Sequence, residues 1–539
     1  MVEKIYFNAD IVTVDDNNPS AQAVYIKDGI IVAVGSEEEI LKYKSDATTV
    51  INLCGKTLIP GFIDPHGHVG MYGLVTKKFP QLSPPPIGNV MNFDNLIVEM
   101  KKNLPKYKRD NGIFVGWGYD DSIIDEKAHP TREILDEIST EVPVACVHAS
   151  GHIGVLNSKA LEVIGYDENT PNPAGGVIRR YPDSNKPNGI LEESAIMNIL
   201  FETFNVTPKE AIKYHLAGVD DYLKAGYTTI QEGATSPQIL QLCKDIADAG
   251  LYKLDVVAYP LNDFEITEGI DSEKVKYNNN FRIGGAKYLL DGSPQGRTAW
   301  MSKPYNMPPK DADANYVAYP IHTDEEVYEY FKTCVENNLQ VLVHCNGDQA
   351  SEQMITQYKK VLKDTGCTKD LRPVMIHAQT VRKDQLERMA KIGIIPSIYT
   401  SHINYWGDCH VQSFGEERGS NVSPMGWALE YGIKPTIHQD PPFLPPNMLH
   451  AMWAAVNRVT RSGRVIAKDQ RITALEALKA ATIYGARQYF EENEKGSIEV
   501  GKRADFVILN KNPLKVDPMD INDISVLQTI KDGNTVSRK

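Results

Sequence analysis

The chain has 539 residues, too many for one ordinary hydrophobic core, so roughly two to four domains are expected. Apolar residues make up 42% and charged residues 24% of the chain, which excludes a disordered or low-complexity protein. The formal net charge of -13 argues against nucleic acid as a partner, because nucleic-acid binding calls for clustered Lys and Arg.

The predicted compartment is the cytoplasm. The first residues have no apolar core of signal-peptide length, and no segment approaches the ~20 apolar residues of a membrane span. Seven cysteines at scattered positions, without a C-x-x-C pair, fit reduced thiols. We expect a small-molecule substrate as partner and no membrane or nucleic acid, and the sequence leaves a homo-oligomer open.

Short strands with turns are predicted at both ends of the chain. Residues 1–58 contain β-rich runs with the hairpin signal Asp28-Gly29, and residues 491–539 have the same texture, with Asp532-Gly533. Each segment is small for a stable sheet. We therefore expect the two segments to pair into one composite β-sandwich.

A candidate metal-binding pattern follows the first strands. An apolar run from Thr57 to Ile63 leads into Asp64-Pro65-His66-Gly67-His68. Because side chains alternate along a strand, His66 and His68 point to the same side and can hold one metal ion together. Residues 59–75 are thus predicted to be the first strand of a barrel and its loop. Taken alone, such a pair is a weak signal, since it also occurs by chance.

The rest of the chain divides into an insertion and a repeating part. Residues 76–209 start with the Pro-rich Ser83-Pro84-Pro85-Pro86 and contain the loop-like residues 171–176, and we predict an inserted α/β lid domain. Residues 210–490 alternate apolar strand-like runs with helix-patterned stretches, which indicates a parallel sheet covered by helices. The predicted fold class is α/β, a TIM-like (β/α)8 barrel.

Strand-like runs in this repeating part end in residues that can bind a metal ion, namely Lys287, His344, His377 and Asp440. In a barrel of parallel strands, functional groups sit at the C-terminal strand ends, so these residues would converge with His66 and His68. For any one of them a hydrogen-bonded core position is the more common role. The series as a whole indicates a metal centre.

This order of residues resembles the amidohydrolase superfamily and, within it, the family 3 branch that includes N-substituted formamide deformylases. The closer match is carried by motifs along almost the whole chain: Gly116-Trp117-Gly118-Tyr119-Asp120, Leu156-Asn157-Ser158-Lys159-Ala160-Leu161, Gly189-Ile190-Leu191-Glu192-Glu193, Leu290-Asp291-Gly292-Ser293, Arg297-Thr298-Ala299 and Gly347-Asp348. The resemblance implies two divalent metal ions, with zinc the first expectation for imidazole ligands. It places His66, His68 and Asp440 on one ion, His344 and His377 on the other, and Lys287 between them as a carbamate formed with CO2.

The implied role of Lys287 sets a condition on the charge of its side chain. An ammonium can neither bind a metal ion nor react with CO2, so Lys287 must lose its proton. Burial and two nearby cations would both lower its pKa. The alternative is an unmodified lysine whose stem lies on the sheet while its head reaches water.

Substrate contacts are predicted by position alone, for Trp117, Tyr119 and His152 in the lid and for Asp291 and Arg297 after the lysine strand. Structural roles, such as a core aromatic residue or a surface ion pair, are equally open for each. The chain departs from the branch where small residues commonly precede the last aspartate, because His438-Gln439 stand there. The loop of residues 293–297 also looks altered, and both departures border the predicted mouth, where the substrate would bind.

The predicted function is a metal-dependent hydrolase of a non-peptide amide or related carbon–nitrogen bond of a small molecule. Metal-activated hydroxide would attack the carbonyl carbon, and Asp440 would carry the proton to the leaving nitrogen. Two alternatives stay open at this point. One is a deaminase or other hydrolase with one metal ion and an unmodified Lys287, and the other is a catalytically silent small-molecule sensor.

Overall fold

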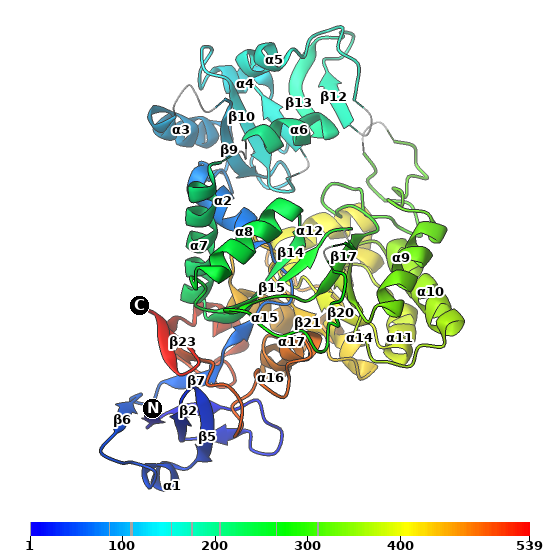
Figure 1. Ribbon diagram of the computed structural model, residues 1–539. Coiled ribbons are helices and arrows are strands. Elements are labelled where there is room, and N and C mark those ends of the chain that lie inside the picture. Colours follow the sequence, from blue (N-terminus) through cyan, green and yellow to red (C-terminus); the bar gives the residue numbers. More distant parts are fainter. Residues whose placement is uncertain are drawn as a thin grey trace. The chain divides into compact units, whose positions relative to one another are not determined.

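A computed structural model describes residues 2–85, 87–107, 112–151, 153–173, 176–203, 206–262, 264–265, 267–309 and 312–539. The chain forms two compact units (Figure 1). The first comprises residues 1–69, 218–441 and 446–539, and the second comprises residues 70–217 and 442–445. Within the described ranges, no helix is both long and apolar enough to cross a membrane.

The first unit is built around a series of parallel strands, and their order across the sheets follows their order in the sequence. Hydrogen-bond ladders join β8 (Phe62–Ile63), β14 (Tyr227–Thr235), β15 (Asp255–Pro260) and β16 (Phe281–Ile283). A second set of ladders joins β17 (Gly285–Leu289), β18 (Gln340–Cys345), β19 (Val374–His377), β20 (Ile395–Ile398) and β21 (Thr436–Ile437). Strands buried on both faces explain the nearly continuous apolar runs of the sequence.

The two sets are continuous through one interrupted strand. Gly284 separates β16 from β17, and its N–H donates to Ala258 O at 2.8 Å. Gly285 is needed for close approach, because a Cβ at this position would lie 2.2 Å from the carbonyl oxygen of Gln340. No ladder joins β8 to β21 within the described part of the chain, so a closed barrel stays a prediction.

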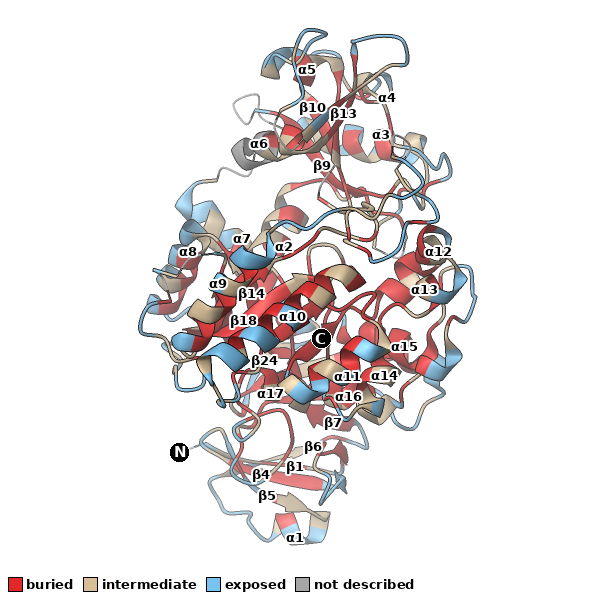
Figure 2. Ribbon diagram, turned by 90° about the vertical axis from the view of Figure 1, so that its right-hand side faces the viewer, coloured by how far each residue is buried: buried red, intermediate tan, exposed pale blue. Residues whose placement is uncertain are grey.

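Helices follow most of these strands and cover them. They are α8 (Pro237–Asp248), α9 (Asp324–Glu336), α10 (Asp348–Thr365), α11 (Lys383–Ile392), α12 (His402–Phe414), α13 (Glu416–Ser420), α14 (Met425–Glu430), α15 (Met448–Asn457), α16 (Ala474–Ala480) and α17 (Ile483–Gln488). Figure 2 shows β14 and β18 buried, whereas α9 and α10 carry exposed residues on their outer side. This arrangement is that of an α/β fold.

The two ends of the chain share one sheet, which has the order β24-β23-β22-β7-β2-β3. Its N-terminal strands are β2 (Asp10–Val12), β3 (Ser20–Ala21) and β7 (Thr57–Pro60), and its C-terminal strands are β22 (Phe506–Leu509), β23 (Val526–Lys531) and β24 (Asn534–Arg538). The two groups meet where β22 pairs antiparallel with β7. Strands from both ends of the chain are therefore joined in one sheet, and a composite β-sandwich stays a prediction.

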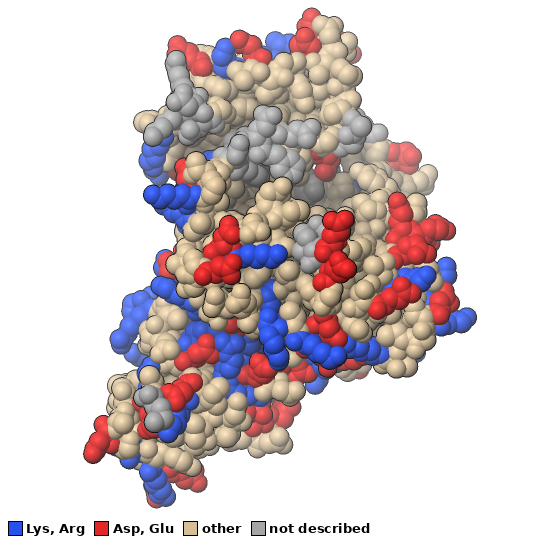
Figure 3. Space-filling view, in the orientation of Figure 1, with Lys and Arg blue, Asp and Glu red and all other residues tan. Residues whose placement is uncertain are grey.

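A second terminal sheet comes from the N-terminal segment alone. It contains β5 (Ile30–Gly35), β4 (Ala23–Lys27), β1 (Glu3–Phe7) and β6 (Thr48–Asn52). The helix α1 (Glu37–Leu41) comes between β5 and β6 in the sequence. One apolar core unites both sheets, since it includes Tyr6 and Ile26 together with Phe506 and Ile530. The exposed sides are solvated, and on the face in Figure 3 charges of both signs are interspersed.

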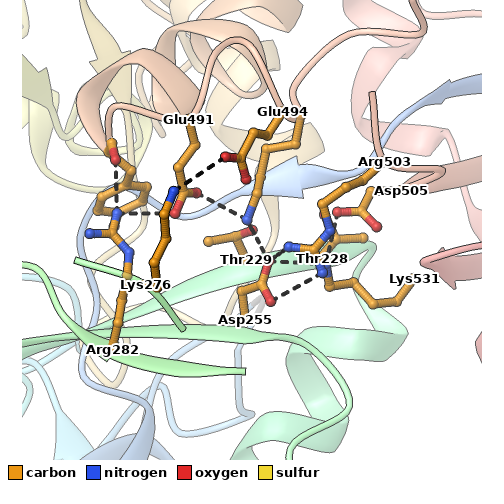
Figure 4. A network of polar contacts seen from close by, with 12 residues as sticks. Thr228, Thr229, Asp255, Lys276, Arg282, Glu491, Glu494, Arg503, Asp505 and Lys531 are labelled. Atoms are coloured by element: carbon orange, nitrogen blue, oxygen red, sulfur yellow. Dashed lines mark hydrogen bonds and ion pairs between the residues drawn. The ribbon is translucent and has the colours of Figure 1, made fainter. Parts of the chain in front are cut away.

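A buried ion network ties the C-terminal segment to the start of β15 (Figure 4). The Asp255 carboxylate, which is 0% exposed, binds the ammonium of Lys531 at 3.0 Å, the guanidinium of Arg503 at 2.8 Å and the ammonium of Lys495. Burial alone would raise the pKa of Asp255, but these cations hold it far below its usual range.

The second unit has its own mixed sheet, of order β12-β13-β11-β10-β9. The strands are β9 (Phe114–Tyr119), β10 (Val144–His148), β11 (Ile153–Leu156), β12 (Gly176–Arg180) and β13 (Pro187–Glu193). Its helices are α2 (Val69–Lys78), α3 (Phe93–Asn103), α4 (Arg132–Asp136), α5 (Ser158–Ile164) and α6 (Ser194–Thr203), and α7 (Pro208–Lys224) leads back to the first unit. This sheet has a hydrophobic core on each of its faces.

Candidate metal centre

The predicted ligands lie at the C-terminal ends of the parallel strands. His66 and His68 follow β8, Lys287 lies in β17, His377 ends β19, and Asp440 comes three residues after the end of β21. His344 lies near the end of β18. Parallel strands that end at one edge bring side chains together even when they are far apart in sequence.

His66 and His68 are both held with Nε2 available as a ligand. His66 Nδ1 lies 2.7 Å from Gln231 Oε1, whose amide is oriented because its Nε2 donates to Pro65 O and to Tyr489 Oη. His68 Nδ1 lies 2.7 Å from the carbonyl oxygen of Gly233. Since these oxygens only accept, both Nδ1 atoms carry a proton, and in a neutral imidazole the Nε2 atom then keeps a free lone pair.

The loop that carries His66 is fastened from the other end of the chain. Tyr489 Oη donates to Asp64 O at 2.7 Å, and Gln488 Nε2 donates to Pro65 O at 2.8 Å. All these groups are buried. The residues that follow the last barrel strand therefore help to fix the position of the first imidazole.

A carboxylate faces the imidazoles. Asp440 Oδ1 lies 3.5 Å from His66 Nε2 and 3.4 Å from His68 Nε2, and Asp440 Oδ2 lies 3.9 Å from His377 Nε2. One atom each from His66, His377 and Asp440 lies within 4.8 Å of the others. Asp440 Oδ1 is buried and makes no hydrogen bond. An unpaired buried oxygen costs free energy unless a ligand or a water molecule binds it.

The backbone is strained at two of these positions. His377 has φ 72° and Asp440 has φ 52°, in the left-handed region that residues other than glycine rarely adopt. Such strain costs about 1–3 kcal/mol per residue and gathers at functional sites. Burial, reinforced by neighbouring positive charge, also holds the pKa of His66 and His377 well below the ordinary value, so both imidazoles are neutral.

The surroundings of Lys287 favour the loss of its proton. It is 2% exposed, and its Nζ lies 3.5 Å from His66 Nε2. Burial lowers the pKa of its ammonium to about 8, although the charge of Asp440 opposes this shift. The amine is therefore partly neutral near physiological pH, as ligation or reaction with CO2 requires.

His344 lies beside this group with a different environment. Its ring centroid is 4.6 Å from that of His377, and its Nε2 lies 3.2 Å from Asn346 Nδ2. Its Nδ1 is buried without a hydrogen bond, 3.2 Å from Asp291 Oδ1. Asp291 itself accepts hydrogen bonds from the backbone N–H groups of Asn346, Gly347 and Trp300.

The predicted substrate contacts occupy varied places. Arg297 is half-buried, and its Nε makes no hydrogen bond. Trp117 and Tyr119 are core residues of the second unit, where Tyr119 Oη lies 3.1 Å from His129 Nδ1. His152 lies outside the described residues. Substrate binding by these side chains stays a prediction.

Tyr399 is a further candidate that the sequence reasoning did not single out. It comes directly after β20 and two residues after Ser397, whose Oγ lies 2.9 Å from His438 Nδ1, so the alternation of side chains turns Tyr399 to the same side. Its ring centroid lies 5.1 Å from that of His438, and its buried hydroxyl makes no hydrogen bond. Its position at a strand end was the available signal.

Another group with metal-ligating side chains occurs in the second unit. Asp120, Asp121 and His148 offer atoms within 4.8 Å of one another. However, the N–H of Ser150 donates to His148 Nδ1 at 3.0 Å, so the ring proton is on Nε2, which lies 3.0 Å from Asp121 Oδ1. A protonated nitrogen cannot bind a metal ion. We interpret this group as a hydrogen-bonded His–Asp pair.

Comparison with known proteins agrees with the resemblance seen in the sequence. The amidohydrolase family matches residues 49–537. An N-substituted formamide deformylase of Arthrobacter pascens is 27% identical over 549 residues, which cover 99% of this chain and 98% of that protein. The protein LONG AFTER FAR-RED 3 of Arabidopsis thaliana is 27% identical over 540 residues, which cover 98% and 90%.

A solved structure has the same fold. The crystal structure of an uncharacterized metal-dependent hydrolase from Pyrococcus horikoshii superposes with a TM-score of 0.75 at 24% identity, covering 96% of this chain and 99% of that one. At this identity the likeness concerns the fold. Because the family match extends over most of the sequence, this chain belongs to the amidohydrolase family and is an enzyme of that family.

Proposed function

We propose that this enzyme is a metal-dependent hydrolase that cleaves a non-peptide amide, or a related carbon–nitrogen bond, of a small molecule. The observation that carries the proposal is a group of imidazoles, of which those of His66 and His377 are neutral, around a buried carboxylate and a lysine whose ammonium has a lowered pKa. Neutral nitrogen and anionic oxygen donors are the ligands that zinc prefers in proteins.

The donor set suits two divalent ions. His66, His68 and Asp440 would hold one ion, and His344 and His377 would hold the other, with Lys287 shared between them as a carbamate. Bound zinc or a similar ion supplies Lewis acidity and a more acidic water molecule. The buried Oδ1 of Asp440, which makes no hydrogen bond, supports this assignment.

The side chains of the chain itself handle the protons. Asp440 Oδ1 accepts the proton of the attacking water and then passes it to the leaving nitrogen, so the amine departs neutral. Tyr399 donates its hydroxyl hydrogen to the carbonyl oxygen, where negative charge develops. Burial, together with the charge of Asp440, raises the pKa of Tyr399 well above its usual value, so the hydroxyl keeps its proton.

The leaving group is expected to be a simple amine. The deformylase relative acts on an N-substituted formamide, and its alignment with this chain extends over nearly the full length of both. This supports N-formyl and N-acyl amines as the first substrates to test. We also propose that β8 and β21 close the strand series into a barrel and that residues 76–209 are its lid.

Metal analysis combined with an amide panel tests this function. The purified chain should contain about two divalent ions and release amine from at least one N-formyl or N-acyl compound. A chelator should abolish the activity, and added metal should restore it. His66→Ala should lose both metal and activity, whereas His322→Ala, which changes a half-buried histidine outside the site, should keep both. Full activity in the chelated protein would refute the proposal.

Bicarbonate separates a carbamate from an unmodified lysine. If Lys287 forms a carbamate, added bicarbonate should speed the recovery of activity when the chelated protein is given metal. A metal content near one ion per chain, with no effect of bicarbonate, would instead favour a hydrolase with one ion and a free Lys287 amine.

A further inference from the structure

His438 is a buried histidine that the ligand set does not include. It follows β21 directly and is 0% exposed. Its Nε2 lies 3.1 Å from His377 Nδ1, and its Nδ1 lies 2.9 Å from Ser397 Oγ in β20. The three side chains form one chain of hydrogen bonds that connects β19, β20 and the end of β21.

The direction of the first hydrogen bond decides whether His377 can bind a metal ion. If His377 Nδ1 donates, its Nε2 has a free lone pair, and this nitrogen faces Asp440 Oδ2 at 3.9 Å. If His438 Nε2 donates instead, the proton of neutral His377 must sit on Nε2, and that nitrogen cannot be a ligand. The state of His438 therefore controls the state of His377.

His66 and His68 have no such choice. Their Nδ1 atoms face the oxygens of Gln231 and Gly233, which only accept hydrogen bonds at these positions. His377 faces another imidazole, which accepts at Nε2 only while its own proton is on Nδ1. Ser397 Oγ stands where it can accept the hydrogen bond of that proton.

The surroundings leave little room for water to replace His438. The centroid of its ring lies 5.4 Å from that of His66, 5.2 Å from that of His377 and 5.1 Å from that of Tyr399. Ser397 is also 0% exposed. Without an acceptor, the Nδ1–H of His377 would be buried and unpaired.

We propose that His438, supported by Ser397, is a positioning residue that holds His377 with its proton on Nδ1 and its Nε2 free for a metal ion. The proposal rests on the proposed function, because it assumes that His377 is a ligand. Removal of a comparable hydrogen bond to a ligand typically weakens metal binding by about 10- to 100-fold.

Two amide variants of the full chain test this role. In His438→Gln the side-chain oxygen reaches the position of Nε2 and can still accept from His377. In His438→Asn the amide reaches only the position of Nδ1 and can serve Ser397 alone. We expect the Gln variant to bind zinc within about 3-fold of the wild type and the Asn variant to bind it about 10- to 100-fold more weakly.

The control is another buried histidine bonded to a serine. His450 Nδ1 lies 2.9 Å from Ser401 Oγ, outside the ligand set, and His450→Asn should leave zinc binding unchanged. Zinc affinity is measured by competition with a coloured chelator, the visible spectrum of the cobalt-loaded protein reports the ligand geometry, and the unfolding midpoint of the metal-free protein reports its fold.

The outcomes separate this inference from the proposed function. Equal zinc affinity and equal cobalt spectra in the Asn variant and the wild type would overturn the role of His438. Equal losses in the Gln and Asn variants would also overturn it, because packing rather than the acceptor would then matter. A wild-type chain that binds no zinc or cobalt would refute both the proposed function and this inference.

Discussion

At the scale of the residue, the site is organised by which nitrogen of each imidazole carries the proton. The Nδ1 atoms of His66 and His68 lie within hydrogen-bond distance of oxygens, and their Nε2 atoms face the Asp440 carboxylate. Single substitutions can therefore test the role of each side chain, with metal content and turnover measured separately.

Asp440→Asn should lower kcat by about 10³-fold, because an amide cannot accept the proton of the attacking water. The amide oxygen can still act as a ligand, so part of the bound metal should remain. Turnover of an N-formyl amine and metal content per chain are measured together. Near-normal turnover would remove Asp440 from the proton path, and Asp408→Asn, which changes a hydrogen-bonded aspartate of α12, serves as the control.

Tyr399→Phe should lower kcat by about 10²-fold with unchanged metal content, because one hydrogen bond to the developing negative charge is lost. The matched control is Tyr405→Phe, since the ring of Tyr405 makes tilted contacts with Trp406 and His450, which lie outside the ligand set. If both variants had the same turnover, the hydroxyl of Tyr399 would have no part in the reaction.

At the scale of the element, β15 is held to the C-terminal segment by charge as well as by packing. Asp255 is the first residue of β15, and its cationic partners come from β23 and from the segment before β22. A carboxylate in this position stabilises the fold only while it is ionised and its partners are in place.

Asp255→Asn should destabilise the fold by about 3–5 kcal/mol, because buried cations lose their partner. In the wild type, the folded pKa of Asp255 lies below the ordinary value of about 3.9, so its contribution is complete above that pH and is lost as the pH falls towards the folded pKa. The urea midpoint, measured from about pH 7 down to about pH 3, should therefore fall more steeply in the wild type. The variant Asp46→Asn, at an exposed position, should behave like the wild type.

At the scale of the whole molecule, the first unit depends on both ends of the chain. Removal of residues 491–539 would take away β22, which pairs with β7, and the cations that neutralise Asp255. We expect such a chain to be insoluble or unfolded, as judged by circular dichroism and size-exclusion chromatography. Deletion of residues 538–539 alone should leave a folded protein, and a folded truncated chain would show that the ends are dispensable.

The sequence predicted the positions of strand ends better than the contacts of side chains. Alternation of apolar runs and the His66-x-His68 pattern pointed to the strand ends where the candidate side chains lie, because residues at strand ends leave a regular trace in the sequence. The role of His438 was hidden, since its partners Ser397 and His377 come from other strands. Trp117 and Tyr119 could be interpreted as pocket residues or core residues, because an aromatic side chain in a strand suits both.

The fastening of the His66 loop by Gln488 and Tyr489 bears on how the enzyme is made in the cell. Asp64 and Tyr489 are 425 positions apart. At typical rates of about 5–20 residues per second, a ribosome needs roughly 20 to 85 seconds to travel between them. During that interval the nascent chain lacks these hydrogen bonds to the His66 loop, so we expect a metal ion to bind tightly to His66 only around or after release from the ribosome.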